Sequence, residues 1–120
     1  FDRWVTDQLA DAHTPESDLA KEGSRLFITK QCIVCHKIAG TAAQGIIGPN
    51  LTHISSRGTI AAGILENDQN GINLTKWLKD PEDIKPGNIM SRQAGVYSDP
   101  DLQMSDDDID ALVAYLLTLK

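Results

Sequence analysis

The residue types best suited to chemistry are two cysteines and a histidine in the run Cys32-Ile33-Val34-Cys35-His36. Two thiols at this spacing can form thioether bonds with the two vinyl groups of a haem, and the adjacent imidazole is then held at the iron. Such bonds would let a small chain carry a large ring and keep it through unfolding. The pentapeptide therefore favours a covalently attached haem.

Three other uses of the two cysteines have to be weighed. A thioredoxin-like redox pair requires a βαβ context, which the sequence does not predict. A structural zinc site requires further ligands, and the chain has no second pair of cysteines. A plain disulfide remains possible in an oxidising compartment.

A haem iron bound by one histidine needs a second axial ligand, and four side chains are candidates: Met90, Met104, His13 and His53. Met90 follows the rigid Pro86-Gly87 turn, which presents its sulfur from a loop. Met104 directly precedes the expected cap of the last helix, where an apolar residue normally packs back on the helix. His13 lies in an expected linker, whereas His53 lies near the haem segment and is the main competitor. We favour Met90, and a thioether ligand raises the reduction potential.

Three segments have the apolar spacing of helices. We expect helices over residues 18–30, 73–80 and 105–119, with Ser17 or Asp18, Asn73 and Ser105 as their caps. Asp108 would complete a capping-box-like start of the last helix. A glycine in mid-helix costs about 1 kcal/mol relative to alanine, so Gly23 suggests a close crossing by another helix.

Irregular backbone is expected between these helices. Residues 37–72 hold six of the nine glycines and read as loop, with a helical turn near Thr59–Leu65. Residues 81–104 read as a second loop because of their turn residues. Loops of this length suit a compact domain only when they wrap a bound group. No strand pattern is evident, so the sequence predicts an all-α fold.

Residues 1–17 read as a tail or linker, and residues 18–120 as the domain. Phe1, Trp4, Val5 and Leu9 could form one helical stripe before a polar segment broken by Pro15. The chain begins with phenylalanine and shows no signal peptide, which suggests a processed or excised piece of a longer protein.

Composition narrows the function classes. The 120 residues carry a formal net charge of -6 without a basic run, which argues against nucleic-acid binding. No stretch approaches the roughly 20 apolar residues of a membrane helix. Aromatic residues make up only 5%, so we expect a large apolar cofactor to supply part of the core.

Over roughly residues 18–120 the sequence resembles the class I cytochrome c family. The matching residues stand in the family's order: Gly23, Phe27, Cys32-x-x-Cys35-His36, Gly48-Pro49-Asn50-Leu51, Arg57, Trp77, Pro86-Gly87-x-x-Met90 and Leu112-Val113-Ala114-Tyr115-Leu116. The resemblance implies a cytochrome c fold, in which the first and last helices cross near Gly23, Phe27 and Tyr115. It also implies one haem c, bound through Cys32 and Cys35.

The resemblance further implies roles around the haem. His36 and Met90 would be the axial ligands of the iron. The carbonyl of Pro49 would accept a hydrogen bond from the free ring N–H of His36 and orient that ring. Arg57 and Trp77 would hydrogen-bond the inner haem propionate, whose burial without donors would be costly.

A closer resemblance is to the cytochrome c domain fused to subunit II of caa(3)-type haem–copper oxidases. It rests on residues 77–90, on residues 106–112 and on Phe1-x-x-Trp4, which is similar to the end of a Cu(A) domain. Residues 91–104 depart from it, because they are longer and more acidic than expected, which puts the local docking surface in doubt.

The resemblance implies an electron-transfer domain, without an active site of its own, that accepts electrons from a respiratory donor and passes them to Cu(A). It also implies an extracytoplasmic location, with attachment to the membrane through the parent subunit and no insertion of the domain itself, which we expect to be monomeric. Six aspartates between Asp99 and Asp110 could steer a basic donor, although helix capping and solubility explain them better. The alternatives are a free monohaem shuttle, against which Phe1-x-x-Trp4 argues, and a five-coordinate ligand-binding or peroxidatic haem protein, against which Met90 argues.

Overall fold

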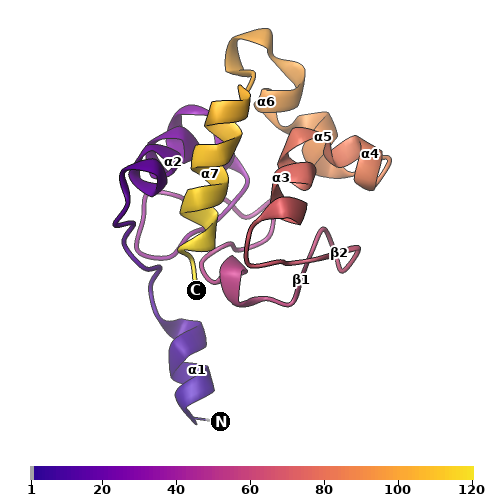
Figure 1. Ribbon diagram of the computed structural model, residues 1–120. Helices are drawn as coiled ribbons and strands as arrows, with labels where there is room; N and C mark the ends of the chain where they lie inside the picture. Colours follow the sequence, from indigo (N-terminus) through magenta and orange to yellow (C-terminus); the bar gives the residue numbers. More distant parts are fainter. Residues whose placement is uncertain (1) are drawn as a thin grey trace.

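Two helices far apart in the sequence cross each other, and shorter helices and loops make up the rest of the molecule (Figure 1). The structure is a computed structural model and describes residues 2–120. The central pair is α2 (Asp18–Thr29) and α7 (Asp106–Leu117). The other helices are α1 (Asp2–Leu9), α3 (Ile72–Lys79), α4 (Pro81–Ile84), α5 (Ile89–Gln93) and α6 (Gly95–Ser98), with the 3-10 turns η1 (Cys32–Val34), η2 (Ile54–Ser56) and η3 (Pro100–Leu102). The predicted all-α class is confirmed.

The crossing of α2 and α7 requires the glycine that the sequence placed in mid-helix. A Cβ on Gly23 would lie 2.7 Å from Cβ of Tyr115 and would clash with the backbone carbonyl of Ala111. Close to the crossing, the rings of Phe27 and Tyr115 meet edge to face with centroids 6.0 Å apart. The predicted close approach of the two helices at Gly23 is therefore confirmed.

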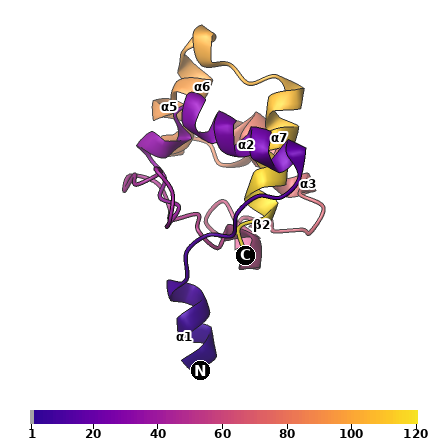
Figure 2. The same cartoon turned by 90° about the vertical axis from the view of Figure 1, so that its left-hand side faces the viewer.

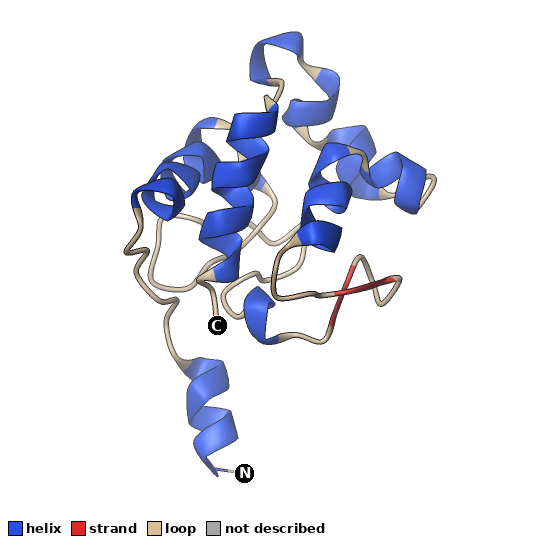
Figure 3. Ribbon diagram, in the orientation of Figure 1, coloured by secondary structure: helices blue, strands red, loops and turns tan. Residues whose placement is uncertain are grey.

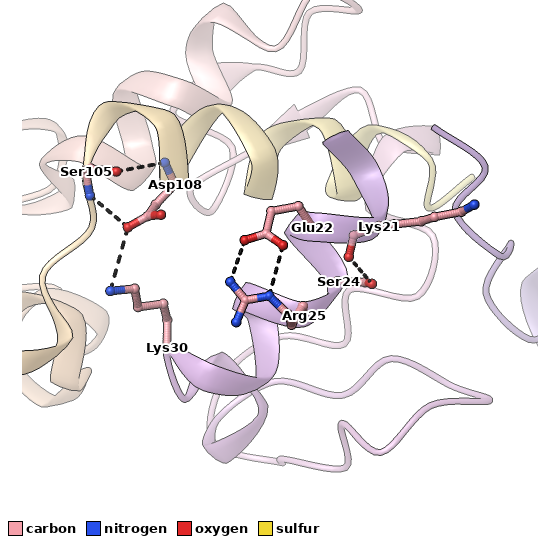
Figure 4. A network of polar contacts seen from close by, with 7 residues as sticks. All are labelled: Lys21, Glu22, Ser24, Arg25, Lys30, Ser105 and Asp108. Carbon is pink, nitrogen blue, oxygen red and sulfur yellow. Dashed lines mark hydrogen bonds and ion pairs between the residues drawn. The ribbon is translucent and has the colours of Figure 1, made fainter. Parts of the chain in front are cut away.

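Side-chain caps stabilise the N-termini of both helices, and Figure 4 shows the cap of α7. The Ser17 hydroxyl accepts a hydrogen bond from the Ala20 N–H, and Ser105 and Asp108 form a reciprocal capping box at the start of α7. Lys30 Nζ lies 3.7 Å from Asp108 Oδ2 and so joins the end of α2 to the start of α7. The predicted caps of these two helices are confirmed.

The cap predicted for α3 is wrong. The N-cap residue is Gly71, at a φ of 73°, and not Asn73. The carboxylate of Asp68 instead accepts hydrogen bonds of 2.8 Å from the N–H groups of Ile72 and Asn73. A carboxylate three residues before the cap supplies the acceptor that asparagine was expected to provide, and its negative charge suits a helix N-terminus.

Residues 37–72 are mostly irregular, as predicted, but the helical turn near Thr59–Leu65 is wrong. Strands β1 (Thr59–Ile60) and β2 (Leu65–Glu66) form a two-residue antiparallel hairpin there, shown in red in Figure 3. Ala61 and Ala62 adopt φ values of 54° and 56°, and Gly63 follows at 87°. This left-handed run turns the chain back on itself instead of continuing a helix.

Residues 81–104 were predicted as a loop, and that prediction is wrong as well. The segment contains α4, α5, α6 and η3, each a single turn or little more. Asp80, Asn88 and Asp99 cap three of them with their side-chain oxygens. Asn, Asp and Pro mark the starts of short helices as well as turns, so the turn signals alone were ambiguous.

Helix α1 stands away from the rest of the molecule and joins it through an extended segment (Figures 1 and 2). None of its residues is buried, and the backbone N–H of Ala12 donates to the Ala39 carbonyl where the chain reaches the body. The helical stripe predicted here extends over Trp4, Val5 and Leu9, while Phe1 lies outside the described residues. The division between residues 17 and 18 stays a prediction.

Candidate functional site

A cavity of about 680 Å³ lies between the end of α2, the cysteine segment, the β1–β2 hairpin, α3 and the α4–α6 segment. This volume is within the roughly 300–1,000 Å³ of pockets that hold cofactors. Its walls are mainly apolar side chains: Phe27, Leu51, Ile54, Ile60, Leu74, Leu78, Val96, Leu112 and Leu116. Lysine and arginine line it in places, but no aspartate or glutamate does.

The two cysteines line this cavity on the short η1 turn. Both thiols are free, so the structure does not contain the disulfide that the sequence left open. Burial raises the pKa of the Cys32 thiol to about 11, so it is protonated near neutral pH. Among residues 2–120 there is also no group of three His, Cys, Asp or Glu side chains that could hold a metal ion, as a zinc site would need.

The ring of His36 is held in one orientation at the cavity wall. Its Nδ1 lies 2.8 Å from the Pro49 carbonyl oxygen. Because a carbonyl can only accept, Nδ1 carries the proton, and a neutral ring then has a free lone pair on Nε2. Burial lowers the pKa of His36, which favours this neutral form.

A glycine leaves room for that ring. A Cβ on Gly48 would lie 2.6 Å from Cε1 and 2.8 Å from Nδ1 of His36. The Gly48 N–H also donates to the Cys35 carbonyl at 2.7 Å, and this bond holds the loop at Gly48 against the cysteine segment. The sequence therefore builds a fixed imidazole beside two thiols.

The other expected site residues come from three separate elements. Arg57, Trp77 and Met90 all line the cavity. Met90 is half-buried on α5, and Trp77 is half-buried on α3. Arg57 follows η2, and its guanidinium donates to the Asn50 carbonyl at 2.6 Å. The fold therefore gathers all seven predicted cofactor-binding residues around one space.

The three residues that compete with Met90 as the second axial ligand differ in their position relative to the cavity. His53 does not line this cavity; its Nδ1 lies 2.6 Å from the Lys120 carbonyl, and its buried Nε2 has no hydrogen-bond partner among residues 2–120. His13 is exposed. Met104 is half-buried and lines the cavity together with Met90, so of the four candidates for the second axial ligand the two methionines line the cavity.

Sequence reasoning missed Tyr97, which lies in the segment predicted to be a loop. It lines the cavity, and its hydroxyl donates to the Leu78 carbonyl at 2.6 Å. Burial raises the pKa of this phenol. The available signal was an aromatic residue, preceded by Val96, in an otherwise polar segment, because such residues are usually buried.

These residues fit a covalently bound haem. The walls are mainly apolar, none of the described residues that line them is an aspartate or glutamate, both cysteines line the space, and the imidazole of His36, bonded through Nδ1, leaves Nε2 for the iron. A thioether reaches the same space from a different part of the chain. Thiol, imidazole and thioether are the groups by which proteins hold haem iron and its ring.

No helix formed by residues 2–120 has the length and apolar character needed to cross a membrane.

Comparison with known proteins agrees with this geometry. The chain is 39% identical, over its full length, to cytochrome c oxidase subunit 2 of Alkalihalophilus pseudofirmus. It is 41% identical to the protein of the same name from Bacillus sp. strain PS3 and 38% identical to that of Bacillus subtilis, again over its full length. The chain spans about a third of each relative, 31% of the first and 32% of the other two. The cytochrome c family model matches residues 20–120, and the chain therefore belongs to the cytochrome c family.

Proposed function

We propose that this chain is the single-haem electron-transfer domain of a respiratory haem–copper oxidase of the caa(3) type. The observation that carries the proposal is the convergence of Cys32, Cys35, His36 and Met90 on one apolar cavity, with Nδ1 of His36 bonded to Pro49. When bound, the haem supplies a one-electron couple between Fe(III) and Fe(II).

Different residues of the chain would bind different parts of the haem. Cys32 and Cys35 would hold the ring, and Nε2 of His36 and the sulfur of Met90 would bind the iron. Pro49 keeps the imidazole oriented, which makes it a better donor. With His36 and Met90 both bound to the iron, the protein would leave no site there for a substrate, and the domain would serve to carry electrons.

Arg57 and Trp77 would supply hydrogen bonds to the inner propionate. Arg57 lines the cavity while its guanidinium is anchored on Asn50 at 2.6 Å. A guanidinium has five N–H donors, so this bond leaves donors available for a carboxylate.

The proposed partners are the Cu(A) domain of the same oxidase subunit, as acceptor, and an upstream respiratory carrier, as donor. The similarity to cytochrome c oxidase subunit 2 over the full chain supports the first assignment. A short linker such as residues 1–17 would hold the two domains at a millimolar effective concentration. We place the domain outside the cytoplasm, attached to the membrane through the rest of the subunit.

The first test is a visible spectrum of oxidised and dithionite-reduced protein, before and after acid–acetone extraction. We expect sharp reduced bands that stay with the polypeptide, because both thiols bind the ring, and a weak far-red iron–sulfur band in the oxidised state. Haem that is extracted completely would refute covalent attachment. Retained haem without the far-red band would instead leave an open or differently filled position and favour ligand binding.

An exposed apolar rim offers the route for electrons. Two exposed side chains, Ile47 and Ile89, line the cavity, and the exposed Val34 and Ile46 are each next in sequence to a residue that lines it. Three of these four residues belong to residues 28–65, a stretch without any acidic residue. The aspartates of residues 99–110 are therefore not part of that stretch. Two of those aspartates are used in capping, Asp99 at η3 and Asp108 at α7, as expected for a capping role.

Placing a carboxylate on this rim is expected to slow electron transfer to a Cu(A) domain. Ile47 lines the cavity and is 60% exposed, so Ile47→Glu adds charge and removes apolar contact area at the cavity edge. We expect the second-order rate constant, measured by stopped-flow mixing, to fall by about tenfold, since loss of a buried isoleucine contact costs about 1–2 kcal/mol. Ile72→Glu, at a 56% exposed position that does not line the cavity, is the matched control. Equal rates in the two variants would place docking elsewhere.

A further inference from the structure

Met90 belongs to a segment of very short helices, residues 81–98, which we call the Met90 segment. Helices α4, α5 and α6 contain only four, five and four residues. Helices this short are not stable alone, because nucleation is costly and few hydrogen bonds follow it. The position of Met90 must therefore depend on contacts that join these helices to one another and to the rest of the fold.

One such contact is made by the carboxylate of Glu82 in α4. Its Oε1 accepts a hydrogen bond of 2.8 Å from the Gly87 N–H, and its Oε2 accepts one of 2.7 Å from the Ser91 hydroxyl. Ser91 directly follows Met90 in α5. Glu82 thus bridges the turn before Met90 and the residue after it, and these two bonds lower the pKa of Glu82 below its usual range.

The second contact is made by Tyr97 in α6. Its hydroxyl donates a hydrogen bond of 2.6 Å to the carbonyl of Leu78, in the last turn of α3. The last four carbonyls of a helix have no partner within the helix, so this bond satisfies one of them. It also joins two elements 19 residues apart, on the wall of the cavity that Met90 lines.

The backbone connects Tyr97 to Met90 through few residues. The Ala94 N–H donates to the Met90 carbonyl at 3.0 Å, and the Tyr97 N–H donates to the Ala94 carbonyl at 3.1 Å. Movement of Tyr97 away from Leu78 would therefore be transmitted through α6 to the end of α5.

We propose that Tyr97 is a positioning residue for Met90, and that Tyr97 and Glu82 together hold the Met90 segment closed over the haem cavity. The Tyr97 hydroxyl ties the far end of the segment to α3, and the Glu82 carboxylate holds α4, the Gly87 turn and α5 together within the segment. The inference rests on the proposed function in one respect, namely that Met90 binds the iron.

The proposal has a measurable consequence for ligand exchange. An added ligand such as imidazole can bind the iron on this side only when Met90 has left it and the segment has moved. Removing a hydrogen bond that stabilises the closed segment makes this opening easier, and the apparent Kd for imidazole falls by the same factor. A net contribution of one hydrogen bond corresponds to about threefold to tenfold.

The experiment is an imidazole titration of the oxidised holoprotein at pH 7, followed by loss of the far-red iron–sulfur band. Tyr97→Phe removes a single oxygen atom, and we expect its apparent Kd to be about threefold to tenfold below that of the unmodified protein. Glu82→Gln should change it in the same direction, because the amide replaces one of the two acceptor oxygens by an NH2 donor and removes the negative charge. Tyr115→Phe removes the same atom from a buried tyrosine of α7 that does not line the cavity, and should stay within about twofold.

The outcomes distinguish the positioning role of Tyr97 from the assignment of Met90 as the iron ligand. An unchanged Kd in Tyr97→Phe, with the far-red band present, would overturn the positioning role and leave Met90 as ligand. If Tyr97→Phe does not fold, Glu82→Gln decides, since its side chain lies at the surface of the segment. Absence of the far-red band from the unmodified protein would instead refute the Met90 assignment and the positioning role with it.

Discussion

Met90→Leu is expected to lower the reduction potential of the holoprotein by on the order of 100 mV or more, since the axial ligand is a main determinant of a range of about 0.8 V. Leucine has nearly the volume of methionine, so it should preserve the half-buried packing of this residue against the core. Leucine has no atom that can bind the iron, so the thioether ligand, which favours Fe(II), is lost. The potential is measured by spectroelectrochemical titration.

The same variant should lose the far-red iron–sulfur band and gain affinity for carbon monoxide, because one axial position becomes open. Met104→Leu is the matched control, since Met104 is the second methionine of the chain and lines the same cavity. It should retain the band and a potential close to the original. A reversed result, with the band lost only in Met104→Leu, would assign the sixth ligand to Met104.

Local signals were sufficient for the parts of the site that are close in sequence. The Cys32-x-x-Cys35-His36 run fixes the relative positions of two thiols and an imidazole almost by itself. The caps of α2 and α7 were also readable, because the serine at each cap accepts a hydrogen bond from the backbone N–H three residues later, and at α7 Asp108 returns a second bond. Such interactions depend on a few neighbouring residues only.

The close helix crossing at Gly23 was predictable for a different reason. A glycine inside an otherwise regular helical pattern is destabilising, and this cost points to a contact that only glycine allows. The partner residues on α7 could not be found in this way. They were named through the resemblance to the cytochrome c family, and the structure places Tyr115 there.

The elements predicted wrongly are mostly those held by side chains from outside the element itself. Asp68 caps α3 from outside the usual position, and Glu82 and Tyr97 secure the Met90 segment through contacts 5 to 19 residues away. The hairpin at Thr59–Glu66 depends on three successive residues with positive φ, two of which are alanines. Alanine rarely adopts this conformation, so the residue types at positions 61 and 62 did not predict the turn.

Gly23→Ala is expected to reduce the free energy of unfolding by about 2–4 kcal/mol, although alanine favours a helix over glycine by about 1 kcal/mol. The two effects have opposite signs, so the measured sign shows which dominates. The added methyl group would clash with the carbonyl of Ala111 and lie 2.7 Å from Cβ of Tyr115. Backbone atoms cannot move aside as a flexible side chain can, so the two helices must separate, and the buried contacts on both sides of the crossing loosen.

Gly58→Ala gives the matched control, because a Cβ at Gly58 has no atom within 4 Å. Urea denaturation of both holoproteins, followed by far-UV circular dichroism, compares the two substitutions directly. We expect Gly58→Ala to change the free energy of unfolding by less than about 1 kcal/mol, in the stabilising direction, since it only restricts the unfolded chain. Since both variants carry the same added methyl group, the difference between them isolates the helix crossing. Because total stabilities are about 5–15 kcal/mol, a loss of 2–4 kcal/mol at Gly23 would identify this crossing as a main support of the cavity that holds His36 and Met90. Equal stability of the two variants would mean that α2 and α7 can separate without cost, and Gly23 would then need another explanation.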